Sequence, residues 1–155
     1  MRRLSEKNLS PSNNIYDIFI CMKVCFKGLN KYFSVEEIEA IKRFIEYLQT
    51  GLSLSKDVHI HFLHERKNKM TTGVRLPHHL IQILAHDRLL IDTMRTLAHE
   101  WVHEYQHQKM GLKDTDKTQD IGGPHENMAN VLAGIFMKKF QNDYPEYEDV
   151  MYGED

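Results

Sequence analysis

The sequence predicts an α+β fold in which helices flank two short strands within a single domain. Three segments carry this prediction. Residues 34–51 repeat apolar side chains at helical spacing, residues 57–64 alternate apolar and polar side chains as a half-buried strand does, and residues 89–110 return to helical spacing. A length of 155 residues is typical of one domain.

The N-terminal part of the chain begins with a polar segment. Residues 1–14 end in SPSNN, so we expect a flexible lead-in before a folded domain at 15–141. Residues 15–29, IYDIFICMKVCFKGL, predict a helix closed by Gly28, although their β-branched and aromatic content also fits a strand. Cys21 and Cys25 would share one face of this helix, where a disulfide is disfavoured, so we expect reduced thiols.

The first clear helix follows Ser34. Ser34 is a favourable N-cap and Glu37 lies three residues later, which together form a capping box. Gly51 lies where a C-cap belongs. The apolar residues at helical spacing are Ile38, Ile41, Phe44, Ile45 and Leu48.

Two strands are expected next. Residues 57–64, DVHIHFLH, form the first strand, and residues 78–86, HHLIQILAH, form the second. Residues 66–73, RKNKMTTG, resemble a turn between them. His59 and His61 lie on one face of the first strand, where a solvent-facing pair is favoured over a metal-binding pair.

Two helices and a tail complete the chain. Apolar residues mark one face of the helix at 89–110: Leu90, Met94, Leu97, Ala98, Trp101 and Tyr105. Gly111 ends this helix, and Pro124 suits the first turn of another helix that reaches about Phe140. Residues 142–155 are acidic, and we expect them to be loose.

Composition excludes several classes of protein. The net charge is −2 with neutral histidines, which argues against a protein that binds nucleic acid by bulk electrostatics. The N-terminal residues lack the apolar core of a signal peptide, and the apolar stretch within 15–29 is too short and too polar to span a bilayer. A cytoplasmic protein is expected, and its oligomeric state is not predictable.

The motif HEWVH, residues 99–103, carries the chemistry. Residues four apart lie on one helix face, so His99 and His103 can meet one Zn²⁺. Glu100 lies about 100° around the helix, where it can act as general base on a water molecule rather than as a third ligand. The apolar stripe lies opposite His103, so the histidines point into a separate space.

A catalytic zinc ion requires a third protein ligand. His107 lies two turns beyond His99, too far for one ion unless the helix breaks. In the following helix, Glu126 could complete a His-His-Glu site, and Asn130, one turn on, could hydrogen-bond the outer nitrogen of a ligating histidine. His125 is an alternative third ligand. Small Ala129 and Ala133 would let this helix approach its neighbour closely.

HEWVH followed by ENMAN resembles the gluzincin branch of the zinc metallopeptidases, especially small single-domain peptidases of bacteria and phages. The resemblance implies a minimal zincin-like fold with N-terminal helices, a small mixed sheet, an active-site helix and a glutamate-bearing helix. It implies one Zn²⁺ per chain on His99, His103 and Glu126. Asn130 departs from the aspartate found in many members, although it keeps a hydrogen-bonding side chain.

The resemblance also implies a peptide or protein substrate. In zincins, an edge strand binds the substrate by strand addition, and element order places this role on the backbone between His79 and Ala85. The expected function is therefore hydrolysis of peptide bonds by a metalloprotease. The alternative is a binding or regulatory module that keeps the fold without turnover. Stabilisation of the oxyanion is unassigned, with Tyr144, Tyr147, Tyr152 and His125 as candidates.

Overall fold

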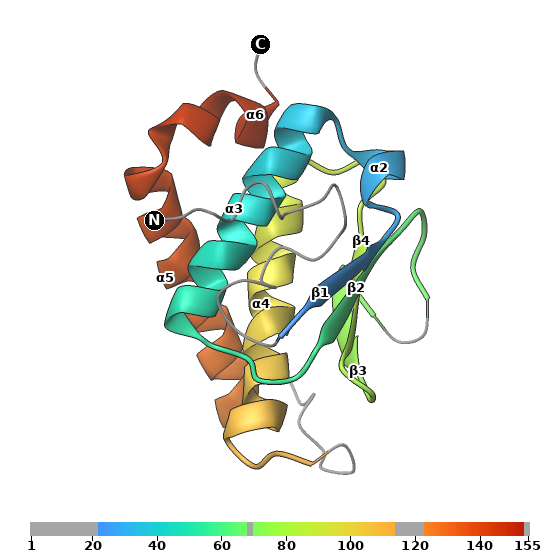
Figure 1. Cartoon of the computed structure of the whole chain (residues 1–155), viewed down its shortest axis with the longest axis vertical. Helices are drawn as coiled ribbons and strands as arrows, with labels where there is room; N and C mark the ends of the chain where they lie inside the picture. The colour runs from blue at the N-terminus through green and yellow to red at the C-terminus, as the bar shows by residue number, and fades with distance from the viewer. Residues whose placement is uncertain (1–21, 68–69, 114–122, 154–155) are drawn as a thin grey trace.

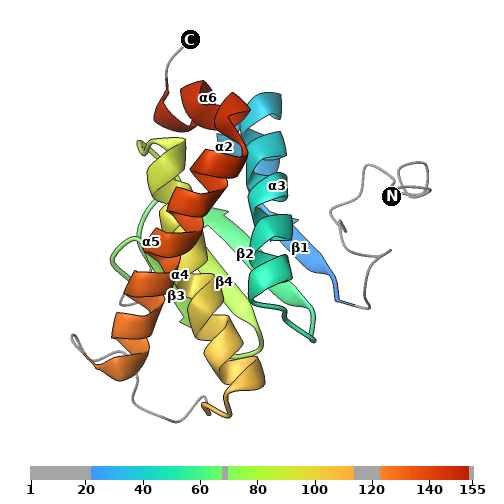
Figure 2. The same ribbon diagram turned by 90° about the vertical axis from the view of Figure 1, so that its left-hand side faces the viewer.

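Three helices cover one side of a four-stranded sheet. The structure, a computed structural model, describes residues 22–67, 70–113 and 123–153. Helices α3 (Val35–Gly51), α4 (Leu90–Lys109) and α5 (Pro124–Asp143) lie on the same side of the sheet, as Figure 1 and Figure 2 show from two directions. The α+β fold is therefore confirmed.

The sheet is mixed. Its strands are β1 (Val24–Lys27), β2 (Val58–Leu63), β3 (Gly73–Leu76) and β4 (Leu80–Leu84), and their order is β1-β2-β4-β3. The first three strands in this order are parallel, whereas β3 runs antiparallel to β4. The antiparallel strand β3 therefore forms one edge of the sheet.

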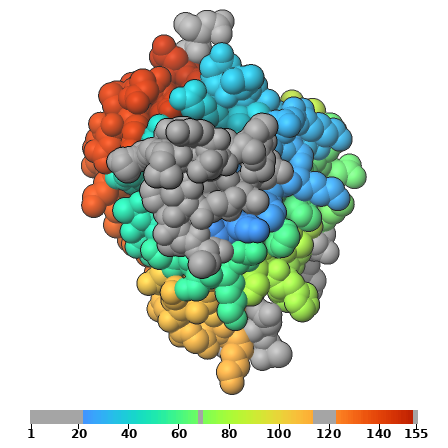
Figure 3. All heavy atoms as spheres, viewed as in Figure 1, coloured from blue at the N-terminus to red at the C-terminus, as the bar shows by residue number. Residues whose placement is uncertain are grey.

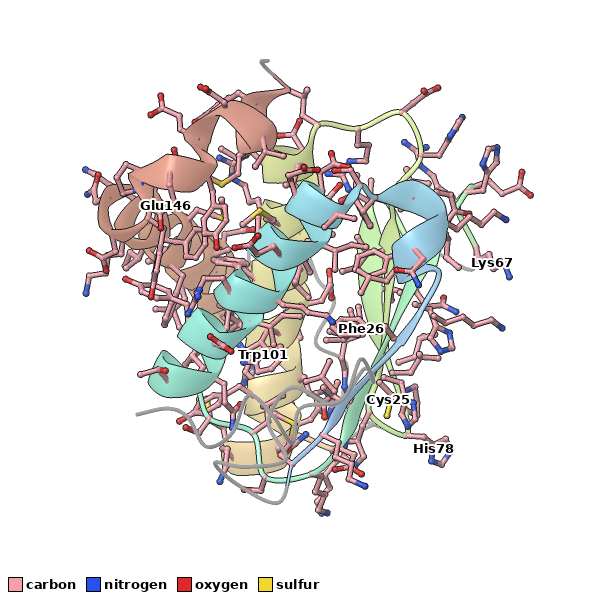
Figure 4. All side chains as sticks on the ribbon, turned by 45° about the horizontal axis from the view of Figure 1, so that its top comes forward. Cys25, Phe26, Lys67, His78, Trp101 and Glu146 are labelled. Atoms are coloured by element: carbon pink, nitrogen blue, oxygen red, sulfur yellow. The ribbon has the colours of Figure 1, made fainter. Side chains whose placement is uncertain are left out.

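The predicted helices α3 and α4 form as their sequence patterns require. Ser34 and Glu37 make both hydrogen bonds of the capping box at the start of α3, at 2.8 and 3.2 Å. The apolar stripe of α4 is buried from Leu90 to Trp101, and Tyr105 packs against its edge. Trp101, labelled in Figure 4, donates its indole N–H to the backbone oxygen of Leu52 at the end of α3. This bond ties α4 to α3 and leaves the opposite face of α4 for polar residues.

The helix predicted at 15–29 is wrong over its described part. Residues 24–27 form β1, and Val24 and Phe26 lie opposite Val58 and Ile60 of β2. The β-branched and aromatic side chains pack on the sheet, so tertiary pairing decides between two local possibilities. Gly28 follows with a left-handed φ of 90° and precedes the short helix α2 (Leu29–Tyr32). Cys25 carries a free thiol, while Cys21 and the lead-in at 1–14 lie outside the described residues.

The expected position of the edge strand is also wrong. The segment 78–86 forms β4, which pairs with β2 on one side and β3 on the other, so its backbone is used within the sheet. The edge is β3, which begins at Gly73 where a turn was predicted. A strand of four residues is too short for its alternation to be recognised against the polar residues before it.

The predicted face of β2 is confirmed. His59 is exposed and His61 is half-buried on the side of the sheet away from the helices, while Val58, Ile60 and Phe62 are buried. Neither histidine belongs to a group of potential metal ligands among the described residues.

The C-terminal segment is ordered rather than loose. Residues Pro145–Tyr147 form a 3-10 turn, η1, and Glu148–Tyr152 form α6. Tyr147 and Met151 are buried against the core, and the hydroxyl of Tyr147 donates to Glu39 at 3.1 Å. In Figure 3, the surface of α5 and α6, in red, continues beside that of α3. The acidic composition concealed this amphipathic pattern.

Within the described ranges, no helix combines the length and the apolar character that crossing a bilayer requires.

Candidate metal centre

Three potential ligands converge between α4 and α5. His99 and His103 lie one turn apart on α4, and Glu126 lies in the first turn of α5. The two Nε2 atoms are 3.2 Å apart. Glu126 Oε1 lies 3.0 Å from His103 Nε2, and Glu126 Oε2 lies 3.0 Å from His99 Nε2. This is the one group of three or more potential metal ligands that the described residues form. The structure therefore brings together the three ligands predicted from the sequence.

The packing of α5 on α4 explains this convergence. Ala129 and Ala133 are buried, and their small side chains let the two helices approach closely. Pro124 occupies the first turn of α5, as predicted, so Glu126 follows at once in that turn. A carboxylate at this position is favoured by the N-terminal end of the helix dipole.

A chain of hydrogen bonds orients the imidazole of His103. The Gln106 amide nitrogen donates to the backbone oxygen of His125 at 3.0 Å, which leaves the Gln106 Oε1 atom facing His103 Nδ1 at 2.9 Å. Because Oε1 can only accept, Nδ1 carries a proton, and in the neutral imidazole the Nε2 lone pair is then on the side of Glu126. Gln106 is thus a partner of His103 that the motif search missed, although it lies three residues after His103.

Asn130 takes the position expected for it beside His99. A side-chain hydrogen bond links the two residues. Burial lowers the pKa of His99, while the negative charge of Glu126 acts in the opposite direction. A lowered pKa favours the neutral imidazole, which is the form that binds a metal.

The spacing of the three groups is close to the spacing of ligands around a zinc ion. Each imidazole Nε2 atom lies within hydrogen-bond distance of a Glu126 oxygen, so either a proton on each imidazole or a cation between the groups holds them together. Tetrahedral coordination with bonds of about 2.0–2.1 Å separates neighbouring ligand atoms by about 3.3–3.4 Å. The observed separations of 3.0 to 3.2 Å need only a small expansion to reach these values. Two imidazoles and one carboxylate are a ligand set typical of catalytic zinc.

Access to the triad is uneven. The side chain of His103 is 2% exposed, whereas those of His99 and Glu126 are 19% and 23% exposed. Both exposed ligands line a cleft of about 700 Å³ between β3, α4 and α5. A molecule in this cleft can therefore reach the exposed side of the triad, at His99 and Glu126.

Glu100 lies beside the triad in an unfavourable setting for a negative charge. Its carboxyl is buried and lines the cleft. Burial and, to a lesser degree, the negative charge of Glu126 together raise the pKa of Glu100 to about 8, against the opposing effect of a hydrogen bond from the Arg75 backbone N–H. A carboxyl group poised near neutral pH is suited to accept and release a proton.

Glu104, one turn after Glu100, has the opposite setting. It is fully buried, and Arg75 Nε, His79 Nδ1 and Gln108 Nε2 surround it at 2.6 to 2.7 Å. Arg75 lies in β3 and His79 in the β3–β4 turn, so this cluster, which we call the Glu104 clamp, attaches the edge strand to α4. His78 and His79 adopt left-handed backbone conformations, with φ of 68° and 62°, which side chains rarely occupy. The bond to Glu104 helps to hold this turn.

The edge strand faces the cleft through its backbone. The Leu84 N–H donates to the Thr72 oxygen at 2.8 Å, and antiparallel alternation then directs the backbone groups of Gly73 and Arg75 away from β4. A Cβ atom at Gly73 would collide with the Thr96 methyl group, so only glycine allows β3 to lie this close to α4. Gly73 itself lines the cleft.

Other predicted candidates lie away from the centre. Helix α4 is unbroken, so His107 remains two turns from His99 and outside the ligand group. His125 contributes its backbone oxygen to Gln106, and its side chain is not among the ligands. Of the tyrosines, Tyr147 donates to Glu39 and Tyr152 to Gln141, and no tyrosine in the described ranges lines the cleft.

No protein-family model, curated protein or solved structure matches this chain.

Proposed function

We propose that the protein is a zinc-dependent metallopeptidase of the zincin type, which hydrolyses a peptide bond with Glu100 as general base. The observation that carries this proposal is the convergence of His99, His103 and Glu126 beside a buried carboxyl group in one cleft. A structural metal site requires no such neighbour, and a buried carboxyl group without a cation weakens the fold.

Each residue has a role that follows from its surroundings. His99, His103 and Glu126 would hold the ion, which when bound supplies Lewis acidity toward water and toward a carbonyl group. Gln106 and Asn130 keep the two imidazoles oriented. Glu100 accepts a proton from a water molecule in the cleft and donates it to the leaving amine.

The substrate proposed is an extended peptide segment added to the outer edge of β3. This edge lies against the cleft, and the backbone groups of Gly73 are directed away from β4, whereas the Arg75 N–H donates to Glu100. Strand addition uses backbone hydrogen bonds, so binding depends little on deep side-chain pockets. The role first placed on residues 79–85 is thus proposed for the start of β3, at Gly73.

The first experiment measures metal content by elemental analysis after reconstitution with zinc. We expect one zinc ion per chain in the wild type, loss of the ion in Glu126→Ala, and retention in the matched control His107→Ala. Retention in Glu126→Ala, or absence of zinc in the wild type, would contradict the proposed site.

The second experiment separates hydrolysis from metal binding. Glu100→Gln has nearly the same shape and removes only the base, so we expect it to retain zinc while cleavage of a mixed library of quenched fluorescent peptides falls by about 10²–10⁴-fold. Zinc without cleavage in the wild type would favour the alternative, a binding module that keeps the fold without turnover. Equal cleavage by Glu100→Gln and the wild type would exclude Glu100 as the base.

A further inference from the structure

The cleft extends past the metal triad toward the start of α4. Its lining there includes Asp92 and Arg95, in the first two turns of α4, and Arg88, which lies just before this helix. On the opposite side, Ala133 and Gly134 of α5 present little bulk, and a Cβ atom at Gly134 would meet nothing within 4 Å. This end of the cleft therefore has room for a side chain or a chain terminus.

Arg88 is the distinctive group in this region. It is half-buried, and it donates to the backbone oxygens of Leu84 and Asp92 and to the Thr96 hydroxyl, each at 3.0 Å. All three acceptors are uncharged, and they hold the guanidinium group at the level of Thr96, one turn from Glu100. Because they account for three of its five N–H donors, Arg88 keeps donors for a further acceptor.

The charges at this end do not balance. Arg95 is paired with Asp92 at 3.4 Å, whereas no carboxylate of the described ranges lies within ion-pair distance of Arg88. Burial lowers the pKa of Arg88, and Asp92 only partly opposes this effect. One positive charge is left without a direct counter-charge in a partly desolvated position, where a bound anion would gain most.

The direction of a bound peptide follows from β3. Gly73 lies against Thr96 and Arg75 reaches Glu104, so β3 runs alongside α4 in the same direction. A peptide that adds antiparallel to β3, the slightly more stable pairing, runs from the Glu104 level toward the Thr96 level. Its residues after the scissile bond therefore approach Arg88.

We propose that Arg88 forms a carboxylate-binding subsite for the part of the peptide that follows the scissile bond. The position relative to the scissile bond rests on the proposed peptidase function, whereas carboxylate binding by Arg88 does not. The carboxylate belongs either to a glutamate or aspartate side chain or to the C-terminus of the substrate. Arg88 is thus a specificity-determining residue.

The test measures binding without catalysis. Metal-free protein labelled with ¹⁵N in its arginines is titrated with matched acetylated tetrapeptides: Ala-Ala-Glu-Ala amide, Ala-Ala-Gln-Ala amide, Ala-Ala-Lys-Ala amide, and Ala-Ala-Gln-Ala with a free C-terminus. The Nε–H signals of Arg88 and Arg95 are assigned from Arg88→Lys and Arg95→Lys. The glutamate amide and the free C-terminus test the two sources of the carboxylate separately.

We expect at least one carboxylate peptide to shift the Arg88 signal saturably at millimolar concentration. The neutral glutamine amide should bind about tenfold more weakly. Arg88→Gln should abolish the preference, and the matched Arg95→Gln should keep it. Should Arg88→Gln fail to fold, Arg88→Lys, which keeps the charge but loses the planar fork, should weaken the preference.

Equal binding of all four peptides, no saturable shift at all, or loss of the preference in Arg95→Gln alone would overturn the subsite.

The zinc-loaded wild type is then given the quenched peptide library, in which cleavage should precede acidic residues or fall near a free C-terminus. Carboxylate binding without any cleavage would refute the peptidase and keep the subsite. Cleavage without carboxylate preference would refute the subsite and keep the peptidase.

Discussion

Glu100 and Glu104 lie one turn apart on α4 and are both buried, at 6% and 0% exposure, yet their surroundings differ in charge. Glu104 receives hydrogen bonds from an arginine, a histidine and a glutamine. Glu100 receives a backbone N–H and faces the negative charge of Glu126. The negative charge of Glu104 is thus compensated where this residue joins β3 to α4, whereas a negative charge on Glu100 is unfavourable where this residue faces the cleft. An uncompensated buried carboxyl group is costly, and its presence beside three potential ligands is the reason why we propose a catalytic role for Glu100.

Breaking the Glu104 clamp should have the largest effect on stability. Arg75→Met leaves the Glu104 carboxylate buried without its arginine, and removal of one partner of a buried pair costs about 3–5 kcal/mol. We expect the free energy of unfolding, measured with urea, to fall by this amount. The double variant Arg75→Met/Glu104→Met should recover much of the loss, because neither charge remains. A loss below about 1 kcal/mol in Arg75→Met would mean that the clamp does not hold β3.

Replacing Glu100 should instead raise the free energy of unfolding, by an amount that depends on pH. The pKa of Glu100 is about 8 in the folded metal-free protein and near 4.5 when unfolded, so the folded state binds an extra proton between these values. The free energy of unfolding should therefore decrease as pH rises, by about 2–3 kcal/mol from pH 5.5 to 7.5 for this group. Glu100→Gln should lose this decrease and be the more stable protein at pH 7.5.

The control for this pH dependence is the difference between the stability curves of the wild type and Glu100→Gln. His99 has a lowered pKa, so its contribution falls as pH decreases through 6.5, opposite in sign to that of Glu100. Subtracting the curve of Glu100→Gln from that of the wild type, both in the presence of a chelator, removes His99 and the other shared groups. Parallel curves over this pH range would show that Glu100 is not held protonated.

The two glutamates also mark what the sequence could predict about the site. His99, Glu100 and His103 follow from spacing on one helix, and Glu126 and Asn130 follow from the next helix along the chain. The Glu104 clamp joins residues 29 positions apart through β3, so no local pattern announces it.

The fold, too, was predictable only where its signals are local in the sequence. Helix α3 was predictable because the capping box and the apolar stripe are both local. Strand β1 was mistaken for a helix because its apolar residues fit either structure until Val24 meets Val58 in β2. The central place of β4 depends on simultaneous pairing with β2 and β3, which no single segment contains. The C-terminal helix α6 was missed because acidic residues surround its one buried side chain, Met151, and Tyr147 just before it.

The smallest expected effect sharpens the comparison at His103, which lies between the two glutamates. Gln106 orients His103, whereas Gln108, on the same helix, donates to Glu104. Gln106→Leu removes the acceptor for the Nδ1 proton, and loss of such a partner costs about 10- to 100-fold in metal affinity. Gln108→Leu should instead lower the free energy of unfolding and leave zinc affinity within about twofold of the wild type. Competition with a zinc-binding dye measures both affinities. If Gln108→Leu weakened zinc as much as Gln106→Leu, the clamp and the metal centre would be one coupled unit, and the division between a neutralised and a poised glutamate would not hold.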